Sequence, residues 1–332
     1  MSLEDLMSLE GIDESLAKKL IAAGIPTVVV LATTPLTKLI HPDFGIELDL
    51  KTARQLLAAA QTRCDTLFGF QTGDALIQQY QSRNYLTTGV KALDAIFPQG
   101  TGLETQQVYE LYGPEGVGKA VLLHQLLCTA ALPLNKGGLA SGAIYIDTEG
   151  SFSLPLLQQI AERFAVPYDT LKRRILKVTP PASEQLLYFC EAQLEPTALQ
   201  HGVRLFCLDS IATPFQADYE GVGQPLPERQ QKLGRLIQAL KRAAQRTNGI
   251  ALYTNQVKRG DTHALGFLVG HGPQVRLRLD FHDRSKRGRV ITIEKAVDSP
   301  LQTAVTQLTR EGFVEPVTRK KRKNSKKQAR NR

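Results

Sequence analysis

The chain has 332 residues, 42% of them hydrophobic, which suits a large α/β domain with a core of ordinary size and a second, smaller domain. Its 41 Lys and Arg residues against 32 Asp and Glu residues give a net charge of +9, but nine of the basic residues lie in the last fourteen positions, where there is no acid. The rest of the chain carries 32 residues of each sign, so the folded body is neutral and the basic character belongs to a tail.

The composition excludes a membrane protein and a disulfide-bonded one. No apolar run approaches the roughly 18 residues of a membrane span, and no charged-then-apolar leader opens the chain. The cysteines have no C-x-x-C spacing and lie in apolar settings, so we interpret them as reduced core residues. We therefore expect a soluble protein of the cytosol or nucleus without a membrane partner. The cysteines are Cys64, Cys128, Cys190 and Cys207.

Residues 1–64 are predicted to form a small helical domain. Residues 9–20 resemble a helix-hairpin-helix, in which a glycine turn joins two short helices and directs backbone N–H groups at a DNA phosphate. Asp13 stands where that motif usually has its second turn glycine, which places a negative charge near the phosphate. A helical domain for interactions with other proteins is the alternative. Residues 51–64 supply a further helix, because their apolar residues recur at helical spacing.

Residues 65–84 are predicted to be a linker that ends the small domain. Phe70 is an isolated aromatic residue in this segment, between glycines and small residues. It either packs on its own domain or anchors in a pocket on a neighbouring subunit, because a lone exposed Phe on a flexible segment is an efficient binding hot spot.

From Tyr85 onward strands alternate with helices, which predicts a mainly parallel sheet covered on both faces. Here an apolar strand, 109–112, leads into the glycine-rich turn 113–118, then Lys119 and a helix, the order that a phosphate-binding loop requires. The glycines let N–H groups approach phosphate oxygens, and Lys119 would reach the β- and γ-phosphates. Ala120 stands where a Mg²⁺-binding hydroxyl residue is expected. The loop predicts nucleotide binding and leaves hydrolysis in question.

Three later strands end in polar residues. The first is followed by Asp147 and Glu149, the second by Asp209, and the third by Asn255 and Gln256. In open α/β sheets ligands bind at the carboxyl ends of the strands, so we expect these side chains to converge on the crevice of the phosphate loop. A single acid at a strand end is most often a helix cap or a solvated group. Three such ends after a phosphate loop favour a functional site.

Several motifs together resemble the RecA/RadA strand-exchange recombinase family, in the branch shared by archaea and eukaryotes, from the N-terminal domain to about residue 317. The phosphate loop alone would indicate only an NTPase. The resemblance implies a RecA-like P-loop NTPase core over 85–317 with a mainly parallel twisted sheet, after an all-α helix-hairpin-helix-type domain over 1–64 and the linker 65–84, and before a disordered basic tail over 318–332. The motifs are Leu86–Gly89, Gly102–Thr105, the phosphate loop, Ile146–Phe152, Leu208–Ser210, Glu228–Leu233 and Thr254–Val257.

The resemblance implies ATP and Mg²⁺ as cofactors and assigns roles to the strand ends. Glu149 would be the base that orients or deprotonates the attacking water, and Gln256 the sensor that links the γ-phosphate to a mobile DNA-binding loop. Asp209 would help to hold Mg²⁺. The residues implied in nucleotide binding are Gly113, Pro114, Glu115, Gly116, Val117, Gly118, Lys119 and Ala120, with Asp298 and Pro300 in a segment that caps ATP across a subunit interface.

The resemblance also implies macromolecular partners, namely recombinase-family subunits in a homo- or hetero-oligomer and single- or double-stranded DNA. Phe70 would be the polymerisation anchor that inserts into the adjacent subunit. Two loops, at about 218–229 and 257–271, would face DNA. The candidate DNA-binding residues in them are Arg229, Lys258, Arg259 and His271.

Departures from the family pattern cluster where chemistry and DNA contact are expected. Ala120 removes a magnesium ligand, and Leu156 replaces an arginine that would stack on adenine. Val222 stands where the first DNA loop usually has an arginine, and residues 265–267 in a shortened second loop replace a Gly-Gly-His run. Together these changes indicate a paralogue rather than the main recombinase.

The basic tail that begins at Arg319 is expected to be disordered, because the run 319–327 has no apolar residue to pack. It is interpreted as a nuclear import signal, as a flexible arm that attracts nucleic acid by neutralising phosphates, or as a solubilising tail. We expect a nuclear protein, with the cytoplasm of an archaeon as the alternative.

These observations favour an ATP-binding recombinase paralogue in homologous recombination and DNA repair, which assembles with recombinase-type subunits on DNA and has weakened or absent ATP hydrolysis. One alternative is an active DNA-dependent ATPase that catalyses homologous pairing and strand exchange, with another oxygen replacing the missing hydroxyl. A second alternative is a purely structural subunit without nucleotide binding. A hexameric helicase with the same core is disfavoured by the N-terminal domain and the Phe70 linker.

Overall fold

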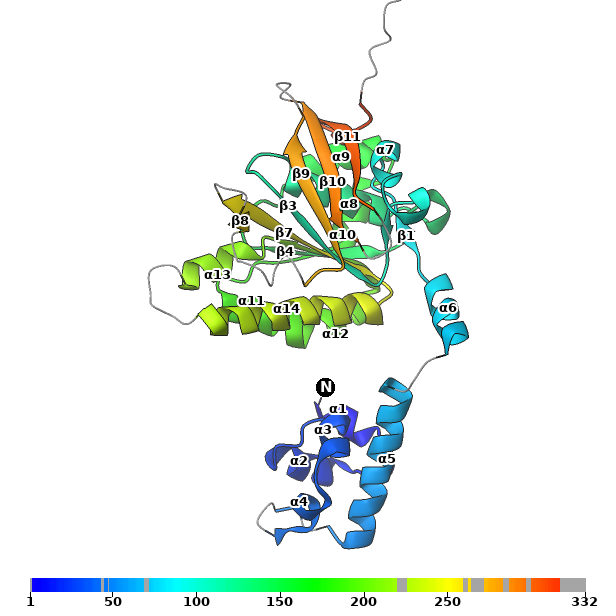
Figure 1. The fold of residues 1–332 in the computed structure, drawn as a ribbon, viewed down its shortest axis with the longest axis vertical. Helices are drawn as coiled ribbons and strands as arrows, with labels where there is room; N and C mark the ends of the chain where they lie inside the picture. The colour runs from blue at the N-terminus through cyan, green and yellow to red at the C-terminus, as the bar shows by residue number, and fades with distance from the viewer. Residues whose placement is uncertain are drawn as a thin grey trace, which may run out of the picture. The chain divides into compact units, whose positions relative to one another are not determined.

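The computed structural model of the protein consists of two compact units, Met1–Gln81 and Ser82–Arg332 (Figure 1). In the described residues the first unit is helical, and the second is built on a large sheet. The structure describes residues 2–42, 45–46, 48–68, 72–219, 226–258, 262–263, 272–282, 287–296 and 300–316.

The first unit packs short helices and one long helix, α5, around an apolar core that includes Leu6, Leu20 and Leu31. Asp13 begins α2, where its carboxylate accepts a 2.7 Å hydrogen bond from the amide of Leu16. This acid is therefore a helix N-cap, which explains its presence in the turn. The helices are α1 (Ser2–Met7), α2 (Glu14–Ala22), α3 (Val28–Thr33), α4 (Leu36–Ile40), α5 (Leu50–Phe68) and α6 (Gly73–Gln81).

The segment predicted to be a linker is largely helical, because it contains the last turn of α5 and all of α6. The first unit accordingly extends to Gln81. Leu76, Ile77 and Tyr80 of α6 recur at helical spacing, and the structure leaves all three exposed. Phe70, the expected anchor, lies outside the described residues.

The second unit contains a mixed, mainly parallel sheet with the strand order β12-β11-β10-β9-β3-β7-β6-β4-β5, and β8 pairs with β7. Neighbours from β9 to β5 are parallel, while β9, β10, β11 and β12 are joined antiparallel. The predicted α/β class with a mainly parallel sheet is confirmed. The strands are β1 (Tyr85–Leu86) and β2 (Leu103–Glu104), which form a separate pair, β3 (Gln107–Gly113), β4 (Gly142–Asp147), β5 (Ile175–Val178), β6 (Val203–Asp209), β7 (Ile250–Lys258), β8 (Thr262–His263), β9 (Val275–Phe281), β10 (Gly288–Lys295), β11 (Gln302–Thr309) and β12 (Gly312–Val314).

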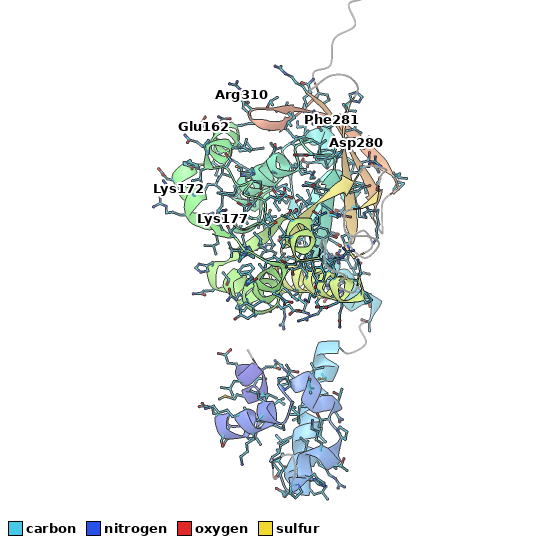
Figure 2. The ribbon with its side chains drawn as sticks, turned by 90° about the vertical axis from the view of Figure 1, so that its left-hand side faces the viewer. Glu162, Lys172, Lys177, Asp280, Phe281 and Arg310 are labelled. Atoms are coloured by element: carbon cyan, nitrogen blue, oxygen red, sulfur yellow. The ribbon has the colours of Figure 1, made fainter. Side chains whose placement is uncertain are left out.

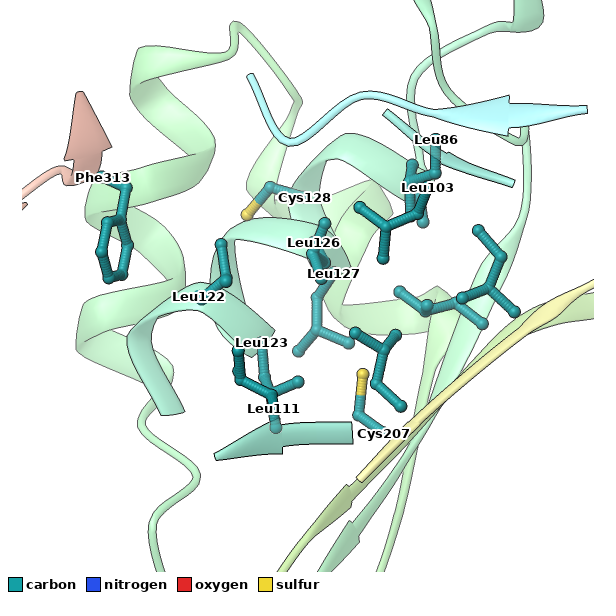
Figure 3. Close-up of a cluster of buried hydrophobic side chains, with 14 of the residues drawn as sticks. Leu86, Leu103, Leu111, Leu122, Leu123, Leu126, Leu127, Cys128, Cys207 and Phe313 are labelled. Atoms are coloured by element: carbon teal, nitrogen blue, oxygen red, sulfur yellow. The ribbon is translucent and has the colours of Figure 1, made fainter. Parts of the chain in front are cut away.

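Helices cover both faces of the parallel strands (Figure 1). Alternate residues of each strand point to opposite faces and pack into two separate cores. Leu111 and Tyr145 belong to the core of α8 and α9, part of which Figure 3 shows, whereas Ile144 and Phe206 belong to the core of α11, α12 and α14. The helices of this unit are α7 (Lys91–Asp94), α8 (Lys119–Ala130), α9 (Leu154–Arg163), α10 (Tyr168–Arg174), α11 (Ser183–Tyr188), the π-helical turn η4 (Phe189–Gln193), α12 (Leu194–His201), α13 (Ala212–Tyr219) and α14 (Leu226–Arg246), with 3₁₀ turns η2 (Pro98–Gly100) and η3 (Leu134–Lys136).

The cysteines are free thiols, as expected. Cys128, Cys190 and Cys207 are buried in the cores, and Cys64 is half-buried. Burial raises the pKa of Cys128 to about 12 and also raises the pKa values of Cys190 and Cys207, so these thiols stay protonated. In the part of the chain that the structure describes, no helix is both long and apolar enough to span a bilayer.

Candidate nucleotide-binding site

The phosphate loop connects the end of β3 to the start of α8. Gly113, Gly116 and Gly118 have φ values of 154°, 72° and 110°, which glycine adopts without steric cost. Two of them are also needed for space, because a Cβ at Gly113 would lie 2.2 Å from the backbone oxygen of Leu279 and one at Gly118 would lie 3.0 Å from Leu308. The loop is therefore packed against β9 and β11, which fixes its path.

Lys119 is the first residue of α8, and its side chain folds back over the loop. Its Nζ donates hydrogen bonds to the carbonyl oxygens of Gly113 and Pro114 at 2.9 and 3.0 Å. Burial lowers the pKa of Lys119, while the charges of Glu149 and Asp209 act in the opposite direction. The ammonium group therefore lies in the electrostatic field of the two acids predicted for the site.

The polar strand ends meet at one edge of the sheet. In the ladder between β3 and β7, Gly113 pairs with Gln256, and in the ladder between β4 and β6, Asp147 pairs with Asp209. Since β7 also pairs with β6, the four strand ends lie next to one another in the order β3, β7, β6 and β4. The parallel register thus brings residues from distant parts of the sequence to the phosphate loop.

Glu149 is exposed, and its Oε1 atom accepts three hydrogen bonds. The donors are Ser210 Oγ at 2.7 Å, Thr213 Oγ1 at 2.9 Å and Gln256 Nε2 at 3.1 Å. Three donors on one oxygen hold the carboxylate in a defined orientation. The predicted base and the predicted sensor are therefore in direct contact.

Asp209 is 2% exposed and accepts hydrogen bonds from three hydroxyl groups. Tyr145 donates to Oδ2 at 2.9 Å, Ser151 donates to the same oxygen, and Thr254 donates to Oδ1. Carboxylate and hydroxyl oxygens are the ligands that Mg²⁺ prefers, so Asp209 with Ser151 fits the ion implied by the sequence. Ala120 contributes no side-chain oxygen to this set.

Asp147, the other acid at the end of β4, has a structural role. Its carboxylate accepts a 3.0 Å hydrogen bond from the Ser151 amide and forms a 3.0 Å ion pair with Lys177, which is labelled in Figure 2. Burial acts to raise the pKa of Asp147, but the hydrogen bonds from Lys177 and the backbone outweigh it, and the pKa lies below its usual value. Asp147 therefore caps the turn that carries Glu149.

His124 connects α8 to the same turn and was not predicted as part of the site. It is fully buried, and its Nε2 accepts a 2.9 Å hydrogen bond from the Ser153 amide. Its Nδ1 is then the protonated nitrogen and donates to the Ala120 carbonyl at 2.7 Å. Burial lowers the pKa of His124, which keeps the ring neutral, and the ring lies 5.3 Å from that of Phe152. The signal in the sequence was a histidine within the mainly apolar helix α8.

The other residues predicted to bind nucleotide are partly described. Glu115 and Gly116 are exposed in the loop, Val117 is buried beneath it, and Pro300 is exposed. Leu156 is half-buried and packs on the core of α8 and α9, so this position presents an apolar surface. Asp298 lies outside the described residues.

Of the four predicted DNA-contacting residues, the structure describes Arg229 and Lys258. Arg229 is half-buried in the first turn of α14, and Lys258 is the last residue of β7. Arg259, His271 and Val222 lie outside the described residues.

Comparisons with known proteins agree with this geometry. A family model described as Rad51 matches residues 80–316, so the sheet unit is a RecA-like core. A "DNA repair and recombination protein RadA" of Methanoculleus marisnigri is 33% identical over 317 residues, which cover 90% of this chain and 94% of the relative. The proteins of the same name from Ignicoccus hospitalis and Aeropyrum pernix are 32% and 31% identical and cover 88% and 90% of this chain and 89% and 92% of their own. The chain therefore belongs to the RecA/RadA recombinase family.

Proposed function

We propose that the protein is an ATP-binding recombinase paralogue that acts in homologous recombination and DNA repair, with weakened or absent ATP hydrolysis. One observation carries the proposal: a phosphate loop with its glycines and Lys119 in place lies beside Glu149 and Asp209, while Ala120 lacks the expected hydroxyl. The relatives from archaea are named as DNA repair and recombination proteins, which supports the cellular role.

Nucleotide binding would use the loop backbone and Lys119. Glycines with positive φ allow successive N–H groups to face one anion, and the N-terminus of α8 adds a partial positive charge. The Lys119 ammonium now donates to the carbonyls of Gly113 and Pro114, and phosphate oxygens would take over these hydrogen bonds.

Hydrolysis would depend on Glu149 and on how firmly the metal is held. Bound Mg²⁺ supplies neutralisation of the β- and γ-phosphate charge. Asp209 and the hydroxyl of Ser151 would hold the ion from the protein side, without the oxygen that Ala120 lacks. Glu149, oriented by Gln256, would accept a proton from the attacking water. We infer slow turnover, because Glu149 would supply the base while the metal would have fewer protein ligands.

An active DNA-dependent ATPase that catalyses homologous pairing and strand exchange is the second candidate. The three hydrogen bonds on Glu149 favour it, because a carboxylate with no catalytic use need not be oriented toward a residue such as Gln256. In that case Ser151 would compensate for the missing hydroxyl.

We further propose assembly with recombinase-family subunits on DNA, through Phe70 and the nucleotide interface, with DNA contacts from the loops near Arg229 and Lys258. The three relatives described above come from archaea, so they support the cytoplasm of an archaeon and give no support to a nuclear location. On that basis the basic tail would be a nucleic-acid-binding arm or a solubilising segment.

Calorimetric titration of Mg·ATP and Mg·ADP into the wild type and Ala120→Thr tests the proposal. We expect the wild type to bind both nucleotides, and Ala120→Thr to increase the magnesium dependence of binding and the rate of ATP turnover. Val121→Thr, which adds a hydroxyl one position further along α8, is the matched control and should change neither.

Two outcomes would contradict the proposal. A wild type that binds neither nucleotide at high concentration would be a purely structural subunit. A wild type that alone catalyses robust strand exchange, with turnover abolished by Glu149→Gln, would be the active recombinase.

A further inference from the structure

Three adjacent strands, β7, β3 and β9, share a buried charged group. Glu110 lies in the middle of β3 and is fully buried. Arg276, its register partner on β9, donates from Nε to Glu110 Oε2 at 2.7 Å. On the other side, Asn255 of β7 donates from Nδ2 to Glu110 Oε1 at 2.9 Å. Both carboxylate oxygens are thus held by residues from different, neighbouring strands.

The contacts continue to β10 through the aromatic ring of Tyr112. The Arg276 guanidinium lies 4.6 Å from the centre of this ring, and its Nη1 lies 3.9 Å from Glu294 Oε2. The Tyr112 hydroxyl donates a hydrogen bond to Glu294. We name this set of residues the Glu110 cluster; it consists of Glu110, Tyr112, Asn255, Arg276 and Glu294.

The Glu110 cluster borders the candidate site on two strands. Asn255 precedes Gln256, and its Oδ1 accepts a 2.9 Å hydrogen bond from the Gln256 amide. The side chain of Gln256 in turn donates to Glu149. Tyr112 precedes Gly113, the first residue of the phosphate loop, and Gly113 is the register partner of Gln256. The cluster therefore lies directly before Gln256 on β7 and directly before the first residue of the phosphate loop on β3.

Packing alone does not explain a charged group at this position. Val108, two residues earlier on the same face of β3, is buried in an apolar core, so the strand accepts apolar residues on this face. Well-packed apolar residues commonly stabilise a fold as well as a buried ion pair does. An ion pair differs from apolar packing in that its hydrogen bonds are directional. The hydrogen bonds from the Arg276 guanidinium and the Asn255 amide fix how β9 and β7 are oriented relative to β3.

We propose that Glu110 and Arg276 are positioning residues that act through Asn255 to hold Gln256 at the γ-phosphate end of the nucleotide site. The inference rests on the proposed nucleotide binding and deepens it, since it names the residues by which the site distinguishes a nucleoside triphosphate from a diphosphate. A diphosphate ends at the loop and Lys119. A triphosphate extends toward Glu149 and Gln256, so its binding depends on the cluster.

The test compares the affinities of full-length protein for ADP and for the non-hydrolysable β,γ-imido analogue of ATP, measured by calorimetry. The variant is Glu110→Gln with Arg276→Met, which replaces the ion pair by neutral side chains of similar size. The matched control is Glu191→Gln with Arg235→Met, which removes an ion pair between η4 and α14 with hydrogen bonds of 2.8 and 2.5 Å. We expect the variant to bind the triphosphate analogue about tenfold more weakly and ADP within about threefold of the wild type, and the control to change neither.

A double-mutant cycle separates positioning from structural support. Gln256→Ala should lose the same discrimination, and its combination with the neutral pair should cause no further loss, because both act through one side chain. Equal losses for both nucleotides, no loss, or additive losses would each overturn the inference while the proposed function stands. A wild type that binds neither nucleotide would contradict both the proposed function and this inference. The titration of the wild type alone reveals that outcome. Should the neutral pair fail to fold, Asn255→Ser, which breaks the link to Gln256 and keeps the ion pair, provides the same comparison.

Discussion

Two regions of the sheet satisfy buried carboxylates in different ways. At the carboxyl edge, Asp209 accepts hydrogen bonds from three neutral hydroxyl groups, and among the described residues no cation forms an ion pair with it. Between β3 and β9, Glu110 is paired directly with Arg276. The first carboxylate has no direct ion pair, although the Lys119 ammonium lies near it, so it can still accept a bound cation, whereas the second is held by its own ion pair, which fixes the geometry of its strands. A direct ion pair therefore distinguishes the supporting framework from the ligand site.

The largest effect is expected where this internal compensation is broken. Glu110→Ala removes the 2.7 Å ion pair with Arg276 and the acceptor of the buried Asn255 amide, and we expect a loss of about 3–5 kcal/mol in the free energy of unfolding. Glu110→Gln combined with Arg276→Met should restore most of that loss. Urea denaturation of the two variants measures the difference, and equal stabilities would show that the two charges do not depend on each other.

At the carboxyl edge, Lys119→Ala should affect the ligand rather than the fold. Without nucleotide the variant should unfold close to the wild type, because its Nζ contacts neutral carbonyls on its own loop. With nucleotide at 100 times the wild-type Kd, the wild type should gain roughly 2.7 kcal/mol and the variant almost none. Thermal unfolding with and without ADP measures this, and an equal gain in both proteins would remove the lysine from the site.

The two regions meet at Gly113, which contacts β9. Gly113→Ala should destabilise the protein by about 2 kcal/mol, because the new Cβ would lie 2.2 Å from the Leu279 oxygen. Gly116→Ala is the control, since it also has a positive φ but nothing within 4 Å of the added Cβ, and it should cost about 1 kcal/mol. The denaturation midpoints of the two variants measure this difference. Equal midpoints would mean that the contact between the loop and β9 does not contribute to stability.

The smallest effect concerns Asp147, which lies at the carboxyl edge but is compensated by Lys177. Its lowered pKa contributes stability that is present above the usual carboxyl pKa and is lost as the pH falls through the folded-state value. Lys177→Met raises that pKa, so it should cost about 0.5–1 kcal/mol at neutral pH and flatten the loss of stability between about pH 5 and pH 2. Lys172→Met, which breaks the pair with Asp169, should change the pH profile less, because Lys172 also lowers the pKa of Asp169 but both side chains are exposed to solvent. A Lys177→Met profile parallel to the wild type would contradict this assignment.

Much of the candidate site could be predicted because its signals are local. The glycine spacing before Lys119 and the polar residue after each apolar strand predicted the phosphate loop and the positions of Glu149, Asp209 and Gln256. The same signals did not separate Asp147 from Asp209, since both follow an apolar strand. The two acids differ only in the residues that they contact. Asp147 pairs with Lys177, which the parallel pairing of β4 with β5 brings beside it.

The supporting residues could not be predicted, since their partners are far away in the sequence. In the sequence, Glu110 is a single acid within an apolar strand. Its partner Arg276 is 166 positions later, and only the fold brings the two together. His124 meets Ser153 across 29 positions in the same way. The helix α6, in contrast, had a local signal that was missed, because Leu76, Ile77 and Tyr80 recur at helical spacing within the segment interpreted as a linker.

By itself the sequence determined the fold class, the phosphate loop and the absence of a hydroxyl at Ala120, because periodicity, glycine spacing and residue type are properties of short segments. The tertiary structure alone decided which acids are compensated, which residues orient Glu149 and Gln256, and which strands hold the loop. These depend on strand order and register, which arise from the packing of the whole sheet between its two helical layers.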